Sequence, residues 1–295
     1  MNSSDRASDR AAYWAARTVL ATLAFTPRFF SEWLARRYTK LLDIGIPRLR
    51  RVGYSNLDMT LPAADHKAII DGVFRSIARI LVAFSRFPRL NKRNIGEWIR
   101  YEGFEHFEEA LLRGKGVLFA TAHLGNWELS AFAHSLMAQP MNVVVRPLDN
   151  KRIDDIVEGY RALSGNKLIE KKEAARSIMK ALAQNEAVGI LIDQNASLDQ
   201  GVFVDFFGVP ACANVAFAKI AARSGAAVIP GFALWSEFEK KYILRFYPIV
   251  EMTGDATVDT AVIQKQLECV IRDHPDQWLW IHRRWKTRPP TEAGN

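Results

Sequence analysis

A histidine and a glutamate separated by four residues form the pair of side chains best suited to general-base chemistry. His123 and Glu128 belong to the segment His-Leu-Gly-Asn-Trp-Glu, which directly follows the apolar residues 116–122. An unperturbed imidazole has a pKa of ~6.5, so at neutral pH it can take a proton from an attacking alcohol. A carboxylate bonded to the other ring nitrogen would fix the tautomer and stabilise the imidazolium ion. The pair predicts a base and its orienting acid, although such a histidine can also simply satisfy a local hydrogen bond.

Backbone amides next to this pair are candidates for binding an oxyanion. Gly125 and Asn126 lie where the chain would turn from a strand into a helix over residues 127–137. The amino end of a helix carries partial positive charge and unpaired N–H groups. We therefore expect Gly125 and Asn126 to contact the substrate. Ser130 lies nearby, but nothing marks it as a nucleophile.

Further polar side chains stand at the ends of two other apolar runs. Asp193 and Gln194 follow the run 189–192, and a buried acid needs partners, although a structural capping role is the simpler alternative. Arg146 follows the run 141–145, and Arg161 lies in the next predicted helix. For both arginines the alternative is an exposed or ion-paired surface residue.

Four segments in this order resemble the bacterial lipid A biosynthesis acyltransferase family, within the His-x4-Asp/Glu lysophospholipid acyltransferase superfamily. They are residues 123–128, 193–194, 201–208 and 280–289, and the resemblance covers about residues 10–290. It implies transfer of a fatty acyl chain from an acyl carrier protein or coenzyme A thioester to a hydroxyl of a lipid A precursor. It also implies a location at the cytoplasmic face of the bacterial inner membrane, peripheral or with a single amino-terminal anchor. The thioester donor is a substrate, and no cofactor is expected.

The resemblance also suggests roles for individual residues. Arg161 falls where the superfamily often places an arginine near the dyad, which makes it a second candidate for stabilising the oxyanion. Arg146 matches a family position that could bind phosphate, and Asp193 with Gln194 would line the acceptor pocket. Because a thiol is a good leaving group, we expect direct attack without an acyl-enzyme.

Other functions stay open. The same chemistry could act on a phosphatidylinositol mannoside, an aminolipid or a lysophospholipid, although glycerophosphate acyltransferases typically carry Asp where Glu128 stands. A non-catalytic membrane lipid-binding protein would retain the fold without turnover. A metal hydrolase is disfavoured because the sequence has no His pair at i, i+4 spacing, so no metal is expected.

Composition and net charge limit the classes of partner that the chain is expected to bind. The chain of 295 residues has a formal net charge of +8 and 2 cysteines, Cys212 and Cys269, without metal-binding spacing. Such a charge attracts nucleic acid, anionic membranes or acidic ligands. No recognisable nucleic-acid module accompanies it, so inner membrane lipids and an acidic or phosphorylated partner are favoured.

Alternating strand and helix patterns predict the elements that would position these residues. Apolar runs at 117–122, 141–146 and 188–193 read as strands, with helices between them. This predicts an α/β fold: one domain over residues 41–295 with a central, mainly parallel mixed sheet flanked by helices. In such folds active sites lie beyond the carboxyl ends of the strands, where His123, Arg146 and Asp193 would emerge.

The first 40 residues predict an amphipathic, membrane-associating helical segment. Aromatic residues alternate there with arginines, as in helices that lie at lipid headgroups, whereas the uncharged stretch between Arg17 and Arg28 is too short to span a bilayer. A helix packed on the domain's own core is the alternative. Near the carboxyl end, basic residues interleaved with tryptophans favour contact with lipid phosphate, an acidic carrier or the membrane: His282, Arg283, Arg284, Lys286 and Arg288.

Overall fold

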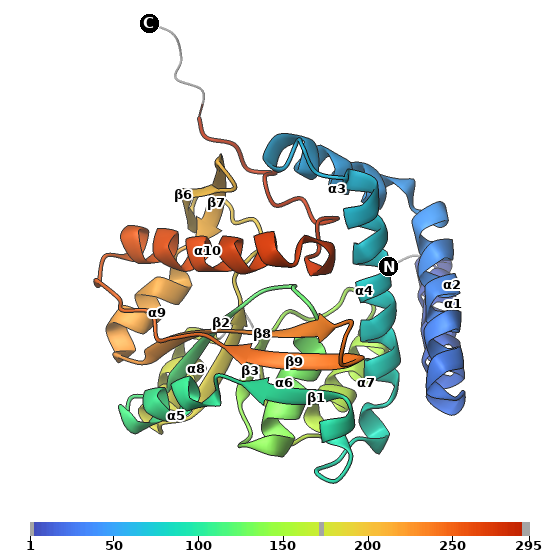
Figure 1. The fold of residues 1–295 in the computed structure, drawn as a ribbon, viewed down its shortest axis with the longest axis horizontal. Coiled ribbons are helices and arrows are strands. Elements are labelled where there is room, and N and C mark those ends of the chain that lie inside the picture. Colours follow the sequence, from blue (N-terminus) through green and yellow to red (C-terminus); the bar gives the residue numbers. More distant parts are fainter. Residues whose placement is uncertain (1–2, 171–173, 291–295) are drawn as a thin grey trace, which may run out of the picture.

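A seven-stranded sheet lies at the centre of the molecule, with helices on both faces (Figure 1). The computed structural model describes residues 3–170 and 174–290. The strand order is β1-β9-β8-β2-β5-β3-β4. The strands are β1 (Ile99–Glu102), β2 (Val117–Thr121), β3 (Asn142–Val145), β4 (Lys167–Glu170), β5 (Ala187–Leu191), β8 (Ala227–Ser236) and β9 (Lys241–Phe246); β6 (Gly201–Phe206) and β7 (Val209–Asn214) form a separate hairpin.

Helices occupy most of the remaining chain. They are α1 (Ser3–Phe25), α2 (Arg28–Gly45), α3 (Pro47–Thr60), α4 (His66–Ser85), α5 (Phe104–Leu112), α6 (Trp127–Met137), α7 (Lys151–Ala162), α8 (Ala174–Ala183), α9 (Ala216–Ser224) and α10 (Ala256–Asp273). Short 3-10 helices cover Phe87–Arg89, Ile95–Glu97 and Pro275–Gln277.

Side-chain alternation along the strands builds two hydrophobic cores. In β2, Leu118 and Ala120 point to the core that α8, α9, α10 and the hairpin cover, while Val117 and Phe119 point to the core that α5 and α6 cover. A strand that buries both faces reads as a continuous apolar run, which is why β2 and β5 are recognisable in the sequence. The prediction of one α/β domain with a mainly parallel mixed sheet is confirmed.

Strand direction places the ends of β2, β3 and β5 at one edge of the sheet. β2 pairs in parallel with β5 and β8, and β3 pairs in parallel with β4 and β5. Only β8 and β9 are antiparallel among the described pairs of this sheet, so β9 and its parallel neighbour β1 run the other way. The loops after β2 and β5 therefore meet at adjacent positions.

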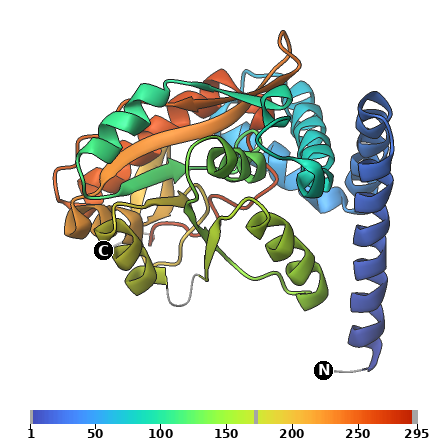
Figure 2. The same cartoon turned by 90° about the horizontal axis from the view of Figure 1, so that it is seen from below.

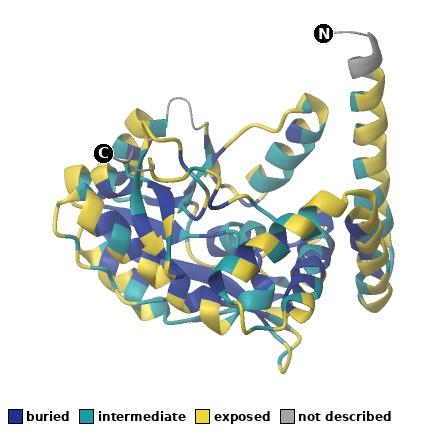
Figure 3. Ribbon diagram, turned by 90° about the horizontal axis from the view of Figure 1, so that it is seen from above, coloured by how far each residue is buried: buried dark blue, intermediate teal, exposed yellow. Residues whose placement is uncertain are grey.

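The amino-terminal segment forms two helices instead of one. α1 and α2 lie against each other and against α4, with the break at Thr26 and Pro27, because a proline has no amide hydrogen to continue the helix. The amino-terminal part of α1 extends well beyond the rest of the molecule (Figure 2) and is largely exposed (Figure 3). Within the described residues, no helix is long and apolar enough to cross a membrane.

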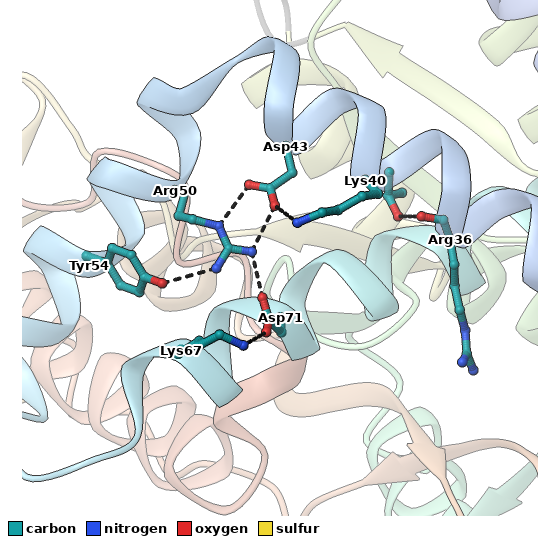
Figure 4. A network of polar contacts seen from close by, with 8 residues as sticks. Arg36, Lys40, Asp43, Arg50, Tyr54, Lys67 and Asp71 are labelled. Carbon is teal, nitrogen blue, oxygen red and sulfur yellow. Dashed lines mark hydrogen bonds and ion pairs between the residues drawn. The ribbon is translucent and has the colours of Figure 1, made fainter.

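An arginine network joins α2, α3 and α4. Arg50 on α3 donates to both carboxylate oxygens of Asp43 on α2, at 2.9 Å each, and to Asp71 on α4 at 2.6 Å (Figure 4). The Arg50 guanidinium lowers the pKa of the Asp43 carboxyl group through this hydrogen bond. The network holds α2, α3 and α4 together, and the remaining Nη1 of Arg50 donates to the Tyr54 hydroxyl at 3.1 Å.

Candidate active site

A histidine–aspartate pair occupies the edge of the sheet where β2 and β5 end. Thr121 on β2 pairs with Leu191 on β5, so His123 and Asp193, two residues further along each strand, lie level with each other. His123 Nδ1 lies 2.9 Å from Asp193 Oδ1, and the His123 amide donates to Asp193 Oδ2 at 3.0 Å. Trp278 Nε1 donates to the same Oδ2 at 2.8 Å. Asp193 is thus buried, fully partnered and rigid.

This contact corrects the expected orienting acid. Glu128 does not hydrogen-bond the His123 ring; Asp193 takes the Nδ1 position that Glu128 was expected to fill. The physical reason is that helix α6 starts at Trp127 and carries Glu128 toward α7, away from Nδ1. There Glu128 accepts two hydrogen bonds from Arg161, at 2.9 Å from Nε and 2.6 Å from Nη2. Arg161 joins the site through this ion pair with Glu128, and its role in stabilising an oxyanion stays a prediction.

Charge around His123 raises the pKa of its imidazole. Burial lowers this pKa, but the Asp193 carboxylate and, more weakly, Glu128 outweigh burial, while Arg161 opposes them. For Asp193, burial raises the pKa, but the His123 ring, the Trp278 indole and the His123 amide together hold it at about 2. Asp193 is therefore a carboxylate at neutral pH, and His123 gains a proton more readily than a free imidazole does.

The turn between β2 and α6 requires glycine. Gly125 has φ +62°, and a Cβ there would lie 2.0 Å from the Ala233 carbonyl oxygen of β8. Its amide donates to the Gln277 carbonyl at 3.0 Å, and the Asn126 amide donates to Ala233 at 2.8 Å. The expectation that these two amides bind an oxyanion is therefore wrong, because both are already bonded to carbonyl groups inside the protein.

Asn126 instead caps α6. Its Oδ1 accepts from the Leu129 amide at 3.0 Å, and its side chain is fully buried. An asparagine at this position satisfies one of the amides that a helix leaves unpaired at its start. Gly125 and Asn126 therefore hold the turn that carries His123, and their backbone amides are bonded within the protein.

Two further predicted residues are exposed, and one of them, Gln194, contacts the pair. Gln194 is exposed, with its Nε2 3.4 Å from His123 Nε2, so it lies on the open side of the imidazole. Arg146 follows β3 and is exposed. It has no ion pair within the described residues, and its role in phosphate binding stays a prediction.

Three residues of the carboxyl-terminal segment complete the site, and sequence reasoning did not place them there. Trp278 bonds Asp193, the Gln277 carbonyl holds Gly125, and the Leu279 amide donates to the His123 carbonyl at 3.0 Å. Their distance along the chain from His123 hides this contact. The tryptophans at positions 278, 280 and 285 were the only feature of the sequence that could have indicated a buried segment here.

The carboxyl-terminal segment combines exposed cations (Arg283, Lys286 and Arg288) with buried tryptophans, so the tryptophans do not support its expected contact with the membrane. Trp278, Trp280 and Trp285 are buried in the core at 2%, 0% and 3% exposure, so they cannot contact lipid directly. Arg284 is also fully buried, with Nη1 on the Cys212 carbonyl at 2.6 Å and Nη2 on Gln264 at 3.1 Å. Burial, opposed by the charges of Asp193 and Cys212, lowers its pKa to about 10. The tryptophans interleave with the arginines because they pack inward.

Comparison with known proteins identifies the family. The bacterial lipid A biosynthesis acyltransferase family matches residues 2–287. A lipid A biosynthesis acyltransferase of Haemophilus influenzae is 24% identical, over 95% of this chain and 89% of that protein. The lipid A biosynthesis palmitoleoyltransferase of Escherichia coli is 29% identical, over 86% of this chain and 85% of that protein.

A relative with another kind of acceptor in its name is the phosphatidylinositol mannoside acyltransferase of Mycobacterium tuberculosis. It is 26% identical, over 76% of this chain and 72% of that protein. These matches, taken together with the α/β fold and the histidine at the end of β2, agree with the resemblance seen in the sequence. The chain belongs to the bacterial lipid A biosynthesis acyltransferase family and is an acyltransferase.

Proposed function

We propose that this acyltransferase moves a fatty acyl group from an acyl carrier protein or coenzyme A thioester to a hydroxyl group of a lipid A precursor. Several relatives are named for lipid A biosynthesis, with lauroyl, myristoyl and palmitoleoyl groups as the acyl chains. Their names support both the acyl group and the acceptor.

The His123–Asp193 hydrogen bond is the observation that carries the mechanism. A carboxylate can only accept a hydrogen bond, so Nδ1 bears the proton, and Nε2 of the neutral ring keeps its lone pair. Nε2 faces the exposed Gln194, on the side from which a substrate can approach. His123 is therefore the general base, and Asp193 orients it.

In the reaction, His123 Nε2 takes the proton of the acceptor hydroxyl as its oxygen attacks the thioester carbonyl carbon. The C–S bond then breaks, and His123 returns the proton to the sulfur, so the carrier leaves as a thiol. Arg161 is our candidate for stabilising the oxyanion. Glu128 accepts from its Nε and Nη2, which leaves Nη1 without an acceptor among the described residues.

A second acceptor has specific support. The relative named for phosphatidylinositol mannoside is similar over most of this chain. Transfer to another glycolipid would use the same base and the same group to stabilise the oxyanion. Only the residues that bind the sugar would differ. We propose the cytoplasmic face of the inner membrane as the location in either case.

Mass spectrometry of lipids from cells with and without the gene tests both acceptors. We expect loss of one acyl chain from lipid A, restored by the wild-type gene and not by His123→Ala. With purified protein, His123→Ala should lower kcat about 10²–10⁴-fold, the usual contribution of a general base. Unchanged turnover would refute the mechanism, and a change confined to another glycolipid would assign the second acceptor.

A further inference from the structure

A basic cleft lies between α3 and the carboxyl-terminal segment, outside the histidine site. Its volume is about 590 Å³. Arg48 and Arg51 of α3 line one wall, and Arg283, Lys286 and Arg288 line the other. Four of these five cations are arginines, whose planar guanidinium groups bind phosphate in a bidentate manner.

Within residues 3–170 and 174–290, no carboxylate pairs with the cations of this cleft. Arg50, their neighbour on α3, bonds two carboxylates (Figure 4). None of the five cleft cations forms an ion pair with any residue that the structure describes. Arg288 donates a hydrogen bond to the sulfur of Met59 at 3.3 Å. Five unpaired cations around one hollow repel each other, and an anion in the cleft would relieve that repulsion.

Two sets of hydrogen bonds, made by Asn56 and by Thr287, hold the walls of the cleft in place and join it to the active site. Asn56, 5% exposed, lines the cleft and donates to the Trp280 carbonyl at 2.7 Å and the His282 carbonyl at 2.8 Å. Thr287 donates from its hydroxyl to the Ala196 carbonyl at 2.8 Å and from its amide to Asn195 Oδ1 at 3.0 Å. Because Asn195 follows Asp193 and Gln194, the wall that carries Arg283 and Arg288 is anchored next to the catalytic pair.

Exposed apolar side chains lie next to the start of α3, which forms one wall of the cleft. Leu41, Ile44 and Ile46 at the end of α2 are exposed, and α3 begins at Pro47, immediately before Arg48. Figure 1 shows the carboxyl-terminal segment running beside α3, whose start is joined to the end of α2. A lipid whose chains lay along the end of α2 would therefore present its headgroup to the cleft.

We infer that this cleft binds a phosphate group on the headgroup of the acceptor lipid, and so positions the acceptor for His123. The inference rests on the proposed function. A phosphate monoester fits a hollow of this size, and the neighbouring apolar surface favours a lipid over a soluble acidic protein. The cleft would make the enzyme selective for phosphorylated acceptors over the same lipids without phosphate.

Kinetics of paired variants test the inference. Arg48→Gln/Arg51→Gln and Arg283→Gln/Arg288→Gln each remove two cations from one wall. Each should raise KM for a phosphorylated lipid A precursor about tenfold or more, as expected for lost charge-assisted hydrogen bonds, with kcat and KM for the thioester unchanged. With the phosphatase-treated lipid, variants and wild type should share one KM. Lys219→Gln/Arg223→Gln on α9, exposed and unpaired in the described structure, is the matched control.

Binding by an inactive protein separates this inference from the proposed function. In the His123→Ala background, we expect phosphatidylcholine vesicles carrying the phosphorylated lipid to bind more tightly than vesicles of equal charge carrying phosphatidylglycerol. The cleft variants should abolish that difference, whether or not acyl transfer is detected. Three outcomes would overturn the inference. The cleft variants could raise only the KM for the thioester, they could lose binding to both kinds of vesicle equally, or they could change neither the kinetics nor the binding.

Discussion

In the proposed mechanism Asp193 controls both the orientation and the charge of the base. Replacing Asp193 therefore distinguishes this mechanism from one that relies on a His123–Glu128 dyad. In Asp193→Asn, an amide replaces the carboxylate that accepts from Nδ1 and that stabilises the imidazolium ion. We expect kcat to fall about 10⁴-fold, as for loss of the acid from a triad. The measurement is the acyl-transfer rate of the purified variant with saturating donor and acceptor. Activity close to that of the wild type would remove Asp193 from the mechanism.

The pH dependence follows from the same contact. Because a general base must be neutral, kcat/KM should rise with pH, with its midpoint above the ordinary value of 6.5 since the pKa of His123 is raised. The residual activity of Asp193→Asn should have its midpoint at lower pH, because the largest raising influence is gone. The raised pKa also stabilises the folded chain below pH 6.5, and this stabilisation is lost as the pH rises through the folded value. A pH–rate profile measures the midpoint directly.

Glu128 acts on the base more weakly and holds Arg161. In Glu128→Gln the carboxylate of a largely buried ion pair is lost, and Arg161 is left without its bidentate partner. We expect kcat to fall about 10²–10³-fold, similar to the loss of one oxyanion donor, with a smaller shift of the pH midpoint than in Asp193→Asn. Glu186→Gln, which breaks the 2.6 Å pair with Lys167 at the other end of β5, is the control and should leave kcat unchanged. Equal effects of the two substitutions would contradict this role.

At the scale of elements, the turn from β2 into α6 depends on a close backbone approach. In Gly125→Ala the new Cβ would meet the Ala233 carbonyl oxygen, and φ is +62°. We expect Gly125→Ala to lower the free energy of unfolding more than Gly114→Ala does. The difference should be about 1–3 kcal/mol, the usual cost of forced overpacking. Gly114 is the control because its φ is +69° and nothing lies within 4 Å of its Cβ position. Urea denaturation measures both variants, and equal losses would show that the contact with β8 is relieved without cost.

The elements were largely predictable from the sequence, but the contacts between them were not. Apolar runs identify β2, β3 and β5 because their side chains are buried or partly buried, and the order of the strands places His123 and Asp193 at one edge. Spacing alone cannot tell which acid reaches the ring, because Glu128 is five residues away along a turn while Asp193 is brought in by strand pairing. Likewise β1, with four residues and no alternating pattern, is recognisable only through its pairing with β9.

At the scale of the whole molecule, the amino-terminal helix pair presents aromatic side chains that are largely or half exposed. Phe25 and Phe29 are each 78% exposed, and Trp33 is 48% exposed on the same pair of helices. Burying such side chains at lipid headgroups is favourable, and nearby arginines attract anionic lipid. We expect Phe29→Ser/Trp33→Ser to weaken binding to phosphatidylglycerol vesicles about tenfold or more, from the loss of two anchors. Co-sedimentation measures this, with Leu112→Ser on the distant α5, 87% exposed, as the control. If Phe29→Ser/Trp33→Ser binds the vesicles as tightly as the wild type and the Leu112→Ser control do, the helix pair does not hold the enzyme at the membrane. A lipid would then have to reach the cleft by another route.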